Sequence, residues 1–226
     1  MIRIYIWRIP RRTVPWAIVQ MALGRIDLGR DAKIDFWKLL GTGRGETFTP
    51  RDADISQWGL LLSTSHSLDS LESLPIISRW RKKALSEFSA TLTPLSSHGQ
   101  WSKREPFVVA SPENSSSTWD GQVAAITRAR IKWRKNPIFW RAVPPVTTSL
   151  HQSPGLLGAI GIGEAPIGLQ GTFSLWKDGR SLRDFAYRGE AHKAAIEATQ
   201  REGWYAEELF ARFAVSDVSG SISRSK

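Results

Sequence analysis

The stretch that decides the fold is residues 183–215, RDFAYRGEAHKAAIEATQREGWYAEELFARFAV. Its pattern predicts a helix that runs into a final strand over Leu209–Val215. Apolar residues recur every three or four positions and share one helical face, and His192 lies on that face. The residues of the face are Leu182, Phe185, Gly189, His192 and Ile196. A histidine at such a position either packs in a core or points into a cavity as a ligand, and this pattern leaves both interpretations open.

Upstream of this helix, the second half of the chain predicts the order strand, helix, strand, strand. Ser181 is the expected N-cap of the His192 helix, with Asp184 three residues further on as in a capping box. An earlier helix begins at Asn136, and Pro144 and Pro145 must bend or split it. The expected strands are Val123–Ile131, Leu156–Ile162 and Leu169–Trp176.

The first half of the chain predicts the same order of elements. Thr13 is the expected cap of a helix that ends near Gly24. Ser67 is the expected cap of a long helix with a kink at Pro75. The expected strands are Ile2–Ile9, the glycine-interrupted stretch 34–48 and Ile55–Ser63, and residues 91–107 are expected to be either irregular or a short strand.

Both halves therefore have the order β-α-β-β-α-β, which is typical of ferredoxin-like folds. The triplet Gly41–Gly43 corresponds to Gly161–Gly163, and Ser67-Leu68 corresponds to Ser181-Leu182. We expect an α+β protein in which two tandem ferredoxin-like repeats form a fused dimeric α+β barrel. The expected division is residues 1–107 for the first repeat, 108–120 for a linker, 121–215 for the second repeat and 216–226 for a disordered tail.

Composition restricts the chemistry of the chain. Its 226 residues include no cysteine, which excludes thiolate-ligated haem and a cysteine nucleophile and fits a reducing cytoplasm. Eleven tryptophans predict an aromatic core or pocket. The net charge of +10 favours phosphate polyanions, anionic lipids or acidic proteins as partners. No apolar run approaches the ~20 residues that span a bilayer, so we expect a soluble or peripheral protein.

Common site motifs are absent or out of context. The glycine-rich run 158–163 leads into a strand rather than a helix, which argues against a dinucleotide loop. The basic run 128–135 is better explained as a strand with a solvated edge than as a nucleic-acid surface, so no nucleic acid is expected. No two histidines have the spacing of a zinc pair, and His66 and His151 are expected on the surface.

Five phrases carry a resemblance to a known family. They are FWKLLGTGRGETF (36–48), HGQWSKREPF (98–107), FWRAVPPV (139–146), GIGEAPIGLQGTFSLW (161–176) and FAYRGEAHKAAIEATQREGWYAEELFARF (185–213). In this order they resemble the spheroidene monooxygenase family from about Tyr5 to Val215. The resemblance implies a haem-containing oxygenase that adds a keto group at C-2 of acyclic carotenoids, using O2 and electrons from reduced ferredoxin.

The same resemblance assigns roles to residues of this chain. His192 is the expected axial ligand of the haem iron, and His98 is the fallback. Arg188, Lys193 or Arg201 would pair with the haem propionates. The other residues expected around the cofactor are Tyr187, Trp204 and Glu164. The expected partners are an apolar carotenoid-like substrate, an acidic ferredoxin-type donor and, at the inner face of the membrane, anionic lipid.

Two other functions are compatible with the sequence. A cofactor-free oxygenase of the α+β barrel type would be colourless and would need a substrate with an acidic phenol or enol. A non-catalytic haem or lipid carrier would bind its ligand and consume no oxygen.

Overall fold

The computed structural model describes residues 1–109, 119–164, 171–188 and 205–222. The strands are β1 (Ile2–Arg8), β2 (Phe36–Gly43), β3 (Ala53–Ser63), β4 (Ser86–Gly99), β5 (Val123–Ile131), β6 (Leu156–Gly163), β7 (Gly171–Trp176) and β8 (Tyr205–Ser219). The α-helices are α1 (Val14–Arg30), α2 (Leu68–Glu72), α3 (Pro75–Arg81), α4 (Asn136–Gln152) and α5 (Gly179–Arg188), and short 3-10 turns are η1 (Arg11–Thr13), η2 (Pro50–Asp52) and η4 (Trp133–Lys135). The predicted α+β class is confirmed.

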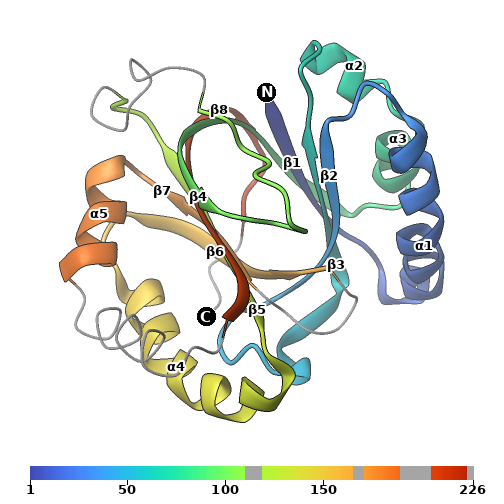
Figure 1. Ribbon diagram of the computed structural model, residues 1–226. Coiled ribbons are helices and arrows are strands. Elements are labelled where there is room, and N and C mark those ends of the chain that lie inside the picture. Colours follow the sequence, from blue (N-terminus) through green and yellow to red (C-terminus); the bar gives the residue numbers. More distant parts are fainter. Residues whose placement is uncertain (110–118, 165–170, 189–204, 223–226) are drawn as a thin grey trace.

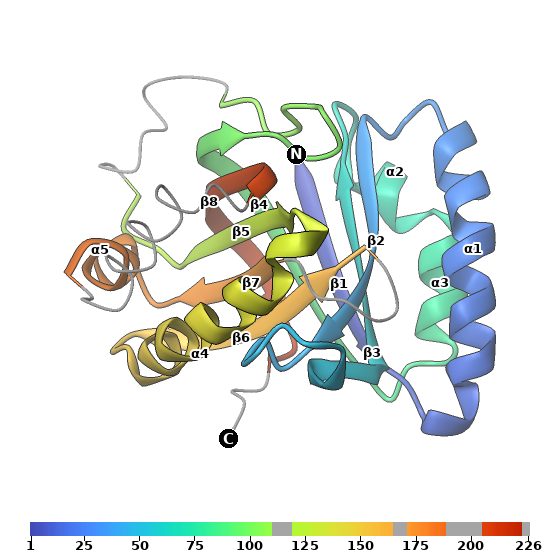
Figure 2. The same ribbon diagram turned by 60° about the horizontal axis from the view of Figure 1, so that its bottom comes forward.

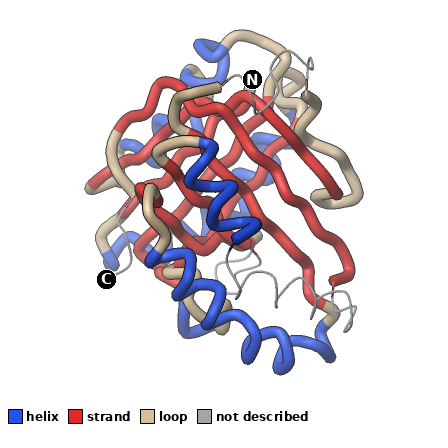
Figure 3. Tube along the Cα trace, turned by 90° about the vertical axis from the view of Figure 1, so that its left-hand side faces the viewer, coloured by secondary structure: helices blue, strands red, loops and turns tan. Residues whose placement is uncertain are grey.

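The eight strands close into an antiparallel barrel in the order β1-β3-β2-β6-β7-β5-β8-β4 (Figures 1 and 3). The first four strands of the chain are arranged as β4-β1-β3-β2 and the last four as β8-β5-β7-β6, so strands of equal rank occupy equal places. Helices α1 and α3 lie outside the first group, and α4 and α5 lie outside the second (Figure 2). Closure leaves no unpaired sheet edge within the barrel.

The two groups of strands join through strands of equal rank. In one join the triplet Gly41–Gly43 of β2 pairs antiparallel with Gly161–Gly163 of β6, and Thr42 lies opposite Ile162. A two-fold axis through this central pair would generate the same register. The other join is between β4 and β8.

Apolar side chains fill the barrel. Ile2, Ile4 and Ile6 of β1 point inward, while Tyr5 and Trp7 point outward and pack under the helices. The interior cluster also takes side chains from every other strand and two from the segment that follows β4. The barrel is therefore a packed core rather than a channel.

An aromatic layer fills the space between the first group of strands and its helices. Trp80 of α3 stacks on Trp7 with ring centroids 5.4 Å apart. The ring centroids of Trp16 and Trp58 lie 5.0 and 6.1 Å from that of Trp80. Truncating a buried tryptophan to alanine costs about 3–5 kcal/mol. Much of the unusual tryptophan content thus stabilises this layer.

The layer over the second group of strands is smaller. Leu182 of α5 is buried, and Phe185 stacks on Trp176 of β7 with ring centroids 5.3 Å apart. These contacts confirm the first two positions of the predicted apolar face. Its remaining positions, Gly189, His192 and Ile196, lie outside the described residues.

Helix boundaries differ from the prediction. Helix α1 continues past Gly24, because this glycine serves close packing rather than termination: a Cβ there would lie 2.8 Å from Cδ1 of Ile76. The long helix predicted after Ser67 is two short helices, and Pro75 is the first residue of α3 instead of a kink within one helix. In α5 the Ser181 N–H donates to Oδ1 of Asp178 at 2.7 Å, so Asp178 provides the cap predicted for Ser181.

Helix α4 spans Pro144 and Pro145 as one helix, so of the two predicted effects, a bend or a split, the split does not occur. Val143 and Leu150 are buried on either side of the prolines and anchor both parts of the helix. The Thr147 hydroxyl donates to the carbonyl oxygen of Glu46 at 2.8 Å and lies 3.0 Å from that of Pro144, so it connects the helix to the loop that follows β2.

The last strands of each half are longer than predicted. The segment 91–107 was expected to be irregular or a short strand, but β4 is a long strand that continues as far as Gly99, because it pairs with both β1 and β8. A register shift between Pro94 and Ser96 accommodates the proline. Strand β8 continues to Ser219, and Ile222 packs in the barrel core, so the disordered tail predicted from residue 216 is wrong as far as 222.

The linker prediction, 108–120, falls largely on residues 110–118, which lie outside the described residues. Among the helices that the structure describes, none combines the length and apolarity needed to cross a membrane.

Candidate functional site

A network of charged side chains closes one end of the barrel around Glu164, the residue that follows β6. Its Oε1 accepts hydrogen bonds from Nε1 of Trp101 at 2.7 Å and from Nη2 of Arg128 at 3.0 Å. Its Oε2 accepts one from Nζ of Lys38 at 2.7 Å. Three donors that are distant in the sequence therefore converge on one carboxylate.

A second carboxylate, Glu207 of β8, extends the network. Arg128 bridges the two carboxylates, because its other terminal nitrogen donates to Glu207. Glu207 also accepts the backbone N–H groups of Ser102 and Lys103, at 3.1 and 2.8 Å. We call these residues the Glu164 cluster; they are Lys38, Trp101, Ser102, Lys103, Arg128, Glu164 and Glu207.

Backbone geometry at the cluster depends on Glu207. Ser102 and Lys103 have positive φ angles of 57° and 59°, which is unusual for residues other than glycine. They form the tight turn between Trp101 and Arg104, whose backbones bond to each other in both directions. Both strained N–H groups point at one carboxylate, so the ion network and the turn stabilise each other.

Both carboxylates are held in the ionised form. Burial would raise the pKa of Glu164, but hydrogen bonds from Lys38 and Trp101 and the charges of Lys38 and Arg128 together lower it. Burial would likewise raise the pKa of Glu207, and hydrogen bonds from Lys103, Arg128 and Ser102 lower it. Neither residue is suited to act as a general acid near neutral pH.

A polar cavity of about 440 Å³ opens beside the cluster. Its lining residues are Ser102, Lys103, Arg128, Arg130, Glu164 and Glu207. Cations outnumber carboxylates in this lining, so the cavity suits water or a small anion better than an apolar molecule.

Trp101 separates this polar cavity from the barrel interior. Its ring is buried against Phe36, with centroids 5.8 Å apart. Lys38 and Arg128 lie over the ring at 5.7 and 5.4 Å from its centroid. The Trp101 ring thus contacts an apolar ring on the interior side and two cations on the side of the cavity. Its indole N–H holds it to Glu164.

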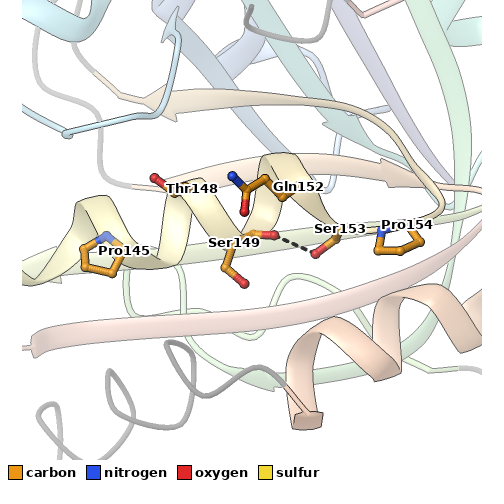
Figure 4. A pocket seen from close by; sticks show the side chains of 6 residues that line it. All are labelled: Pro145, Thr148, Ser149, Gln152, Ser153 and Pro154. Carbon is orange, nitrogen blue, oxygen red and sulfur yellow. Dashed lines mark hydrogen bonds between the residues drawn. The ribbon is translucent and has the colours of Figure 1, made fainter.

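A second cavity of about 460 Å³ lies along α4, on the side of the molecule that carries α5 (Figure 4). Its lining residues are Pro145, Thr148, Ser149, Gln152, Ser153 and Pro154. The Ser153 hydroxyl donates to the carbonyl oxygen of Ser149 at 2.7 Å and closes the last turn of the helix.

His151, on the same helix, differs from its prediction. It was expected on the surface, but both ring nitrogens are buried, and no hydrogen-bond partner for them exists among the described residues. An imidazole buried in this way is costly unless something binds it.

The residues predicted around the cofactor do not form one described site. Glu164 is the centre of the cluster at the barrel end. Tyr187 lies on α5, 61% exposed, and its hydroxyl accepts a hydrogen bond from Arg212 at 3.2 Å. His98 is exposed on β4, opposite Phe210 of β8. Arg188 is the last residue of α5, and its side chain is not described.

The remaining predicted residues, Lys193, Arg201, Trp204 and the predicted iron ligand His192, lie outside the described residues. Their roles stay predictions.

Sequence reasoning missed several members of the cluster. Arg128 was read as part of a solvated strand edge, yet it is only 3% exposed. Lys38, Trp101 and Glu207 were not singled out. A signal existed, because four of the five phrases that carry the family resemblance each contribute at least one cluster member.

The chain was compared with known proteins. No family model matches it. The spheroidene monooxygenase of Rhodobacter capsulatus is 37% identical over 215 residues, which cover 92% of this chain and 87% of that protein. The spheroidene monooxygenase of Cereibacter sphaeroides is 33% identical over 209 residues, which cover 91% of this chain and 63% of that protein.

Among solved structures, an aldoxime dehydratase matches with a TM-score of 0.54 at 8% identity, over 96% of this chain and 81% of that chain. A second aldoxime dehydratase, in complex with butyraldoxime, matches with a TM-score of 0.51 at 12% identity, over 96% and 79%. These two likenesses show a shared fold. Because the similarity to the Rhodobacter capsulatus protein extends over nearly the whole of both chains, the present chain belongs to the spheroidene monooxygenase family.

Proposed function

We propose that this protein is a carotenoid monooxygenase that introduces a keto group at C-2 of an acyclic carotenoid. The observation that carries the proposal is the 37% identity to a spheroidene monooxygenase across 92% of the chain. The reaction uses O2 and takes electrons from reduced ferredoxin, in the cytoplasm at the inner face of the membrane.

The proposed cofactor is haem, whose iron His192 would hold. No three metal-binding side chains gather among the described residues, and a haem iron needs only one axial side chain from the protein. The described chain fits a group of this kind in one respect: the buried nitrogens of His151 are left for a ligand to satisfy. His151 therefore joins His98 as an alternative to His192.

The residues proposed around the cofactor have distinct tasks. Arg188, Lys193 or Arg201 would pair with the propionates, and Tyr187 and Trp204 would help to line the pocket. Haem, when bound, supplies the activation of O2. The protein contributes position and the exclusion of water.

The Glu164 cluster supports this function by closing the barrel end. Its ionised carboxylates hold Trp101 and Arg128 in place, and Trp101 keeps water away from the apolar interior. The exposed cations Lys103 and Arg130 at its rim offer a docking point for an acidic ferredoxin.

The barrel is proposed to be a fusion of two ferredoxin-like repeats, residues 1–107 and 121–215. The equal places of strands of equal rank and the register of Gly41–Gly43 on Gly161–Gly163 support this origin.

The first experiment is an absorption spectrum of the protein produced with added haem precursor, together with His192→Ala, His151→Ala and His98→Ala. Loss or shift of the Soret band only in the His192 variant supports the proposed ligand. The same effect in another variant would move the ligand to that residue.

A folded protein without a Soret band would refute the haem proposal and favour a cofactor-free oxygenase. A carotenoid product assay with reduced ferredoxin separates an enzyme from a haem or lipid carrier, because a carrier would show the Soret band and form no ketone.

A further inference from the structure

Helix α1 is apolar on both of its faces. Between Val14 and Gly24 its only polar residue is Gln20, which is buried. The inner face of the helix packs on the aromatic layer through Ala17, Met21 and Leu28. A surface helix normally carries polar residues on its opposite face, and between Val14 and Gly24 this one carries none there.

The outer face of α1 presents an aliphatic stripe to solvent. Its large members, Ile18, Val19, Leu23 and Ile26, are each 48–51% exposed. With the exposed Pro15 and Ala22 they recur at helical spacing and form a continuous band. Figure 2 shows α1 at the periphery of the molecule, on the side away from α4 and α5.

Arginines surround this stripe. Arg11 and Arg12 precede the helix, Arg25 flanks the stripe, and Arg30 ends it, and all four are exposed. Among the ion pairs of the described residues none involves them, although Arg25 donates to a backbone carbonyl. The one acidic residue of the helix, Asp27, is already paired with Arg79.

We propose that the outer face of α1 docks this protein on an anionic lipid bilayer, with the aliphatic stripe in the headgroup boundary and the arginines on lipid phosphates. This inference rests on the proposed function in so far as it explains access to a carotenoid dissolved in the membrane. The surface itself is argued from α1 alone.

A protein partner fits this face less well. One convex helix offers six stripe residues, whereas stable protein interfaces use about 20–30 residues on each side. A second copy packed antiparallel would bring Arg11 and Arg12 close to Arg30 of the partner and would suffer like-charge repulsion. A bilayer requires no shape complementarity and supplies the negative charge.

The test is flotation of the full-length protein with vesicles of phosphatidylcholine alone and with vesicles that also contain phosphatidylglycerol. The wild type should bind the anionic vesicles preferentially and release them at high salt. Val19→Gln with Leu23→Gln, and separately Arg12→Gln with Arg30→Gln, should each lower partitioning on the order of tenfold.

Matched controls carry the same chemical changes elsewhere. Ile55→Gln with Leu157→Gln removes two exposed aliphatic side chains from β3 and β6, and Arg180→Gln with Arg183→Gln removes two charges from α5. Both controls should bind like the wild type. Absence of vesicle binding by the wild type, or equal losses in test and control variants, would overturn the proposal.

Two further measurements distinguish lipid docking from self-association and from the proposed enzymatic function. Light scattering without lipid should show the same mass for wild type and the Val19/Leu23 variant; a lower mass in the variant would assign the stripe to a second copy and overturn the proposal. Oxidation of a detergent-dispersed carotenoid should be unchanged in this variant, while oxidation of a vesicle-bound carotenoid should fall. A wild type that binds vesicles and oxidises neither form would refute the proposed function and leave the docking surface intact.

Discussion

The indole N–H of Trp101 donates to Oε1 of Glu164 at 2.7 Å, across the end of the barrel. This bond connects the apolar interior, where the Trp101 ring packs, to the ion network outside. It makes the position of the ring depend on the charge of a carboxylate 63 positions further along the chain.

Trp101→Phe should therefore destabilise the protein more than a conservative aromatic exchange usually does. The variant leaves the half-buried carboxylate of Glu164 without one donor, and hydrogen bonds to charged groups contribute about 1.5–3 kcal/mol. Urea unfolding measures the loss. Trp176→Phe is the matched control, because that buried indole donates to the neutral hydroxyl of Ser174 at 2.9 Å. An equal or larger loss in the control would contradict this account.

The free energy of unfolding should fall at acidic pH, because Glu164 and Glu207 of the Glu164 cluster become protonated. The folded-state pKa values of Glu164 and Glu207 lie below their ordinary value of 4.5, so the unfolded chain takes up protons first. The stabilisation that the ionised carboxylates provide is fully present above their ordinary pKa. It is lost as the pH falls through their lowered folded-state pKa values. Unfolding free energies measured at a series of pH values, from neutral to below the ordinary carboxyl pKa, should show this decrease.

Glu164→Gln is the control for the acid limb, because the amide does not titrate. Its unfolding free energy should depend less steeply on pH below the ordinary carboxyl pKa than that of the wild type. Identical slopes would mean that other carboxylates account for the acid sensitivity.

Gly99→Ala should distort the backbone at the end of β4, two residues before Trp101. Gly99 has a φ of +89°, and an added Cβ would lie 2.2 Å from the carbonyl oxygen of Glu208. Backbone strain of this kind costs about 1–3 kcal/mol before the clash is counted. Thermal unfolding provides the measurement. Gly29→Ala in α1 is the control: its nearest contact would be 4.0 Å away, and it should stabilise the helix by up to about 1 kcal/mol.

Local patterns predicted much of the barrel. The alternation of Ile2, Ile4 and Ile6 with Tyr5 and Trp7 marked a strand, and the structure adds that both faces are buried. Repetition of the order of elements suggested how strands would be distributed. Boundaries failed where tertiary contacts override local signals, as at Gly24, where close packing required a glycine inside a helix.

The candidate site was less predictable. Glu164 was expected near the cofactor, and among the described residues it accepts hydrogen bonds from Lys38, Trp101 and Arg128. These donors come from two other strands and a turn, and no spacing along the chain relates them to Glu164. Arg128 shows the limit best, because an alternating basic strand looks solvated until another segment covers it.

Removing the imidazole of His151 should stabilise the haem-free protein. His151→Leu deletes two buried nitrogens that have no partner among the described residues. This deletion should raise the free energy of unfolding by about 1–3 kcal/mol. Differential scanning calorimetry of haem-free samples tests this. His66→Leu changes an exposed histidine and should stay within about 0.5 kcal/mol of the wild type. Destabilisation by His151→Leu without haem would show that the imidazole is satisfied in the folded chain.

Arg128 should be the most sensitive member of the cluster, because it is the cation shared by Glu164 and Glu207. Arg128→Met removes the donor that Glu164 and Glu207 share, and breaking a buried ion pair in this way costs about 3–5 kcal/mol. Glu207→Gln alone should cost less, since Arg128 keeps its pair with Glu164 and the one amide oxygen still accepts the N–H group of either Ser102 or Lys103. The double variant should be more stable than the sum of the two losses implies, because the charge left uncompensated by the first change is removed by the second. Additive losses in a double-mutant cycle would mean that Arg128 acts through the packing of its side chain over Trp101 and not through its charge.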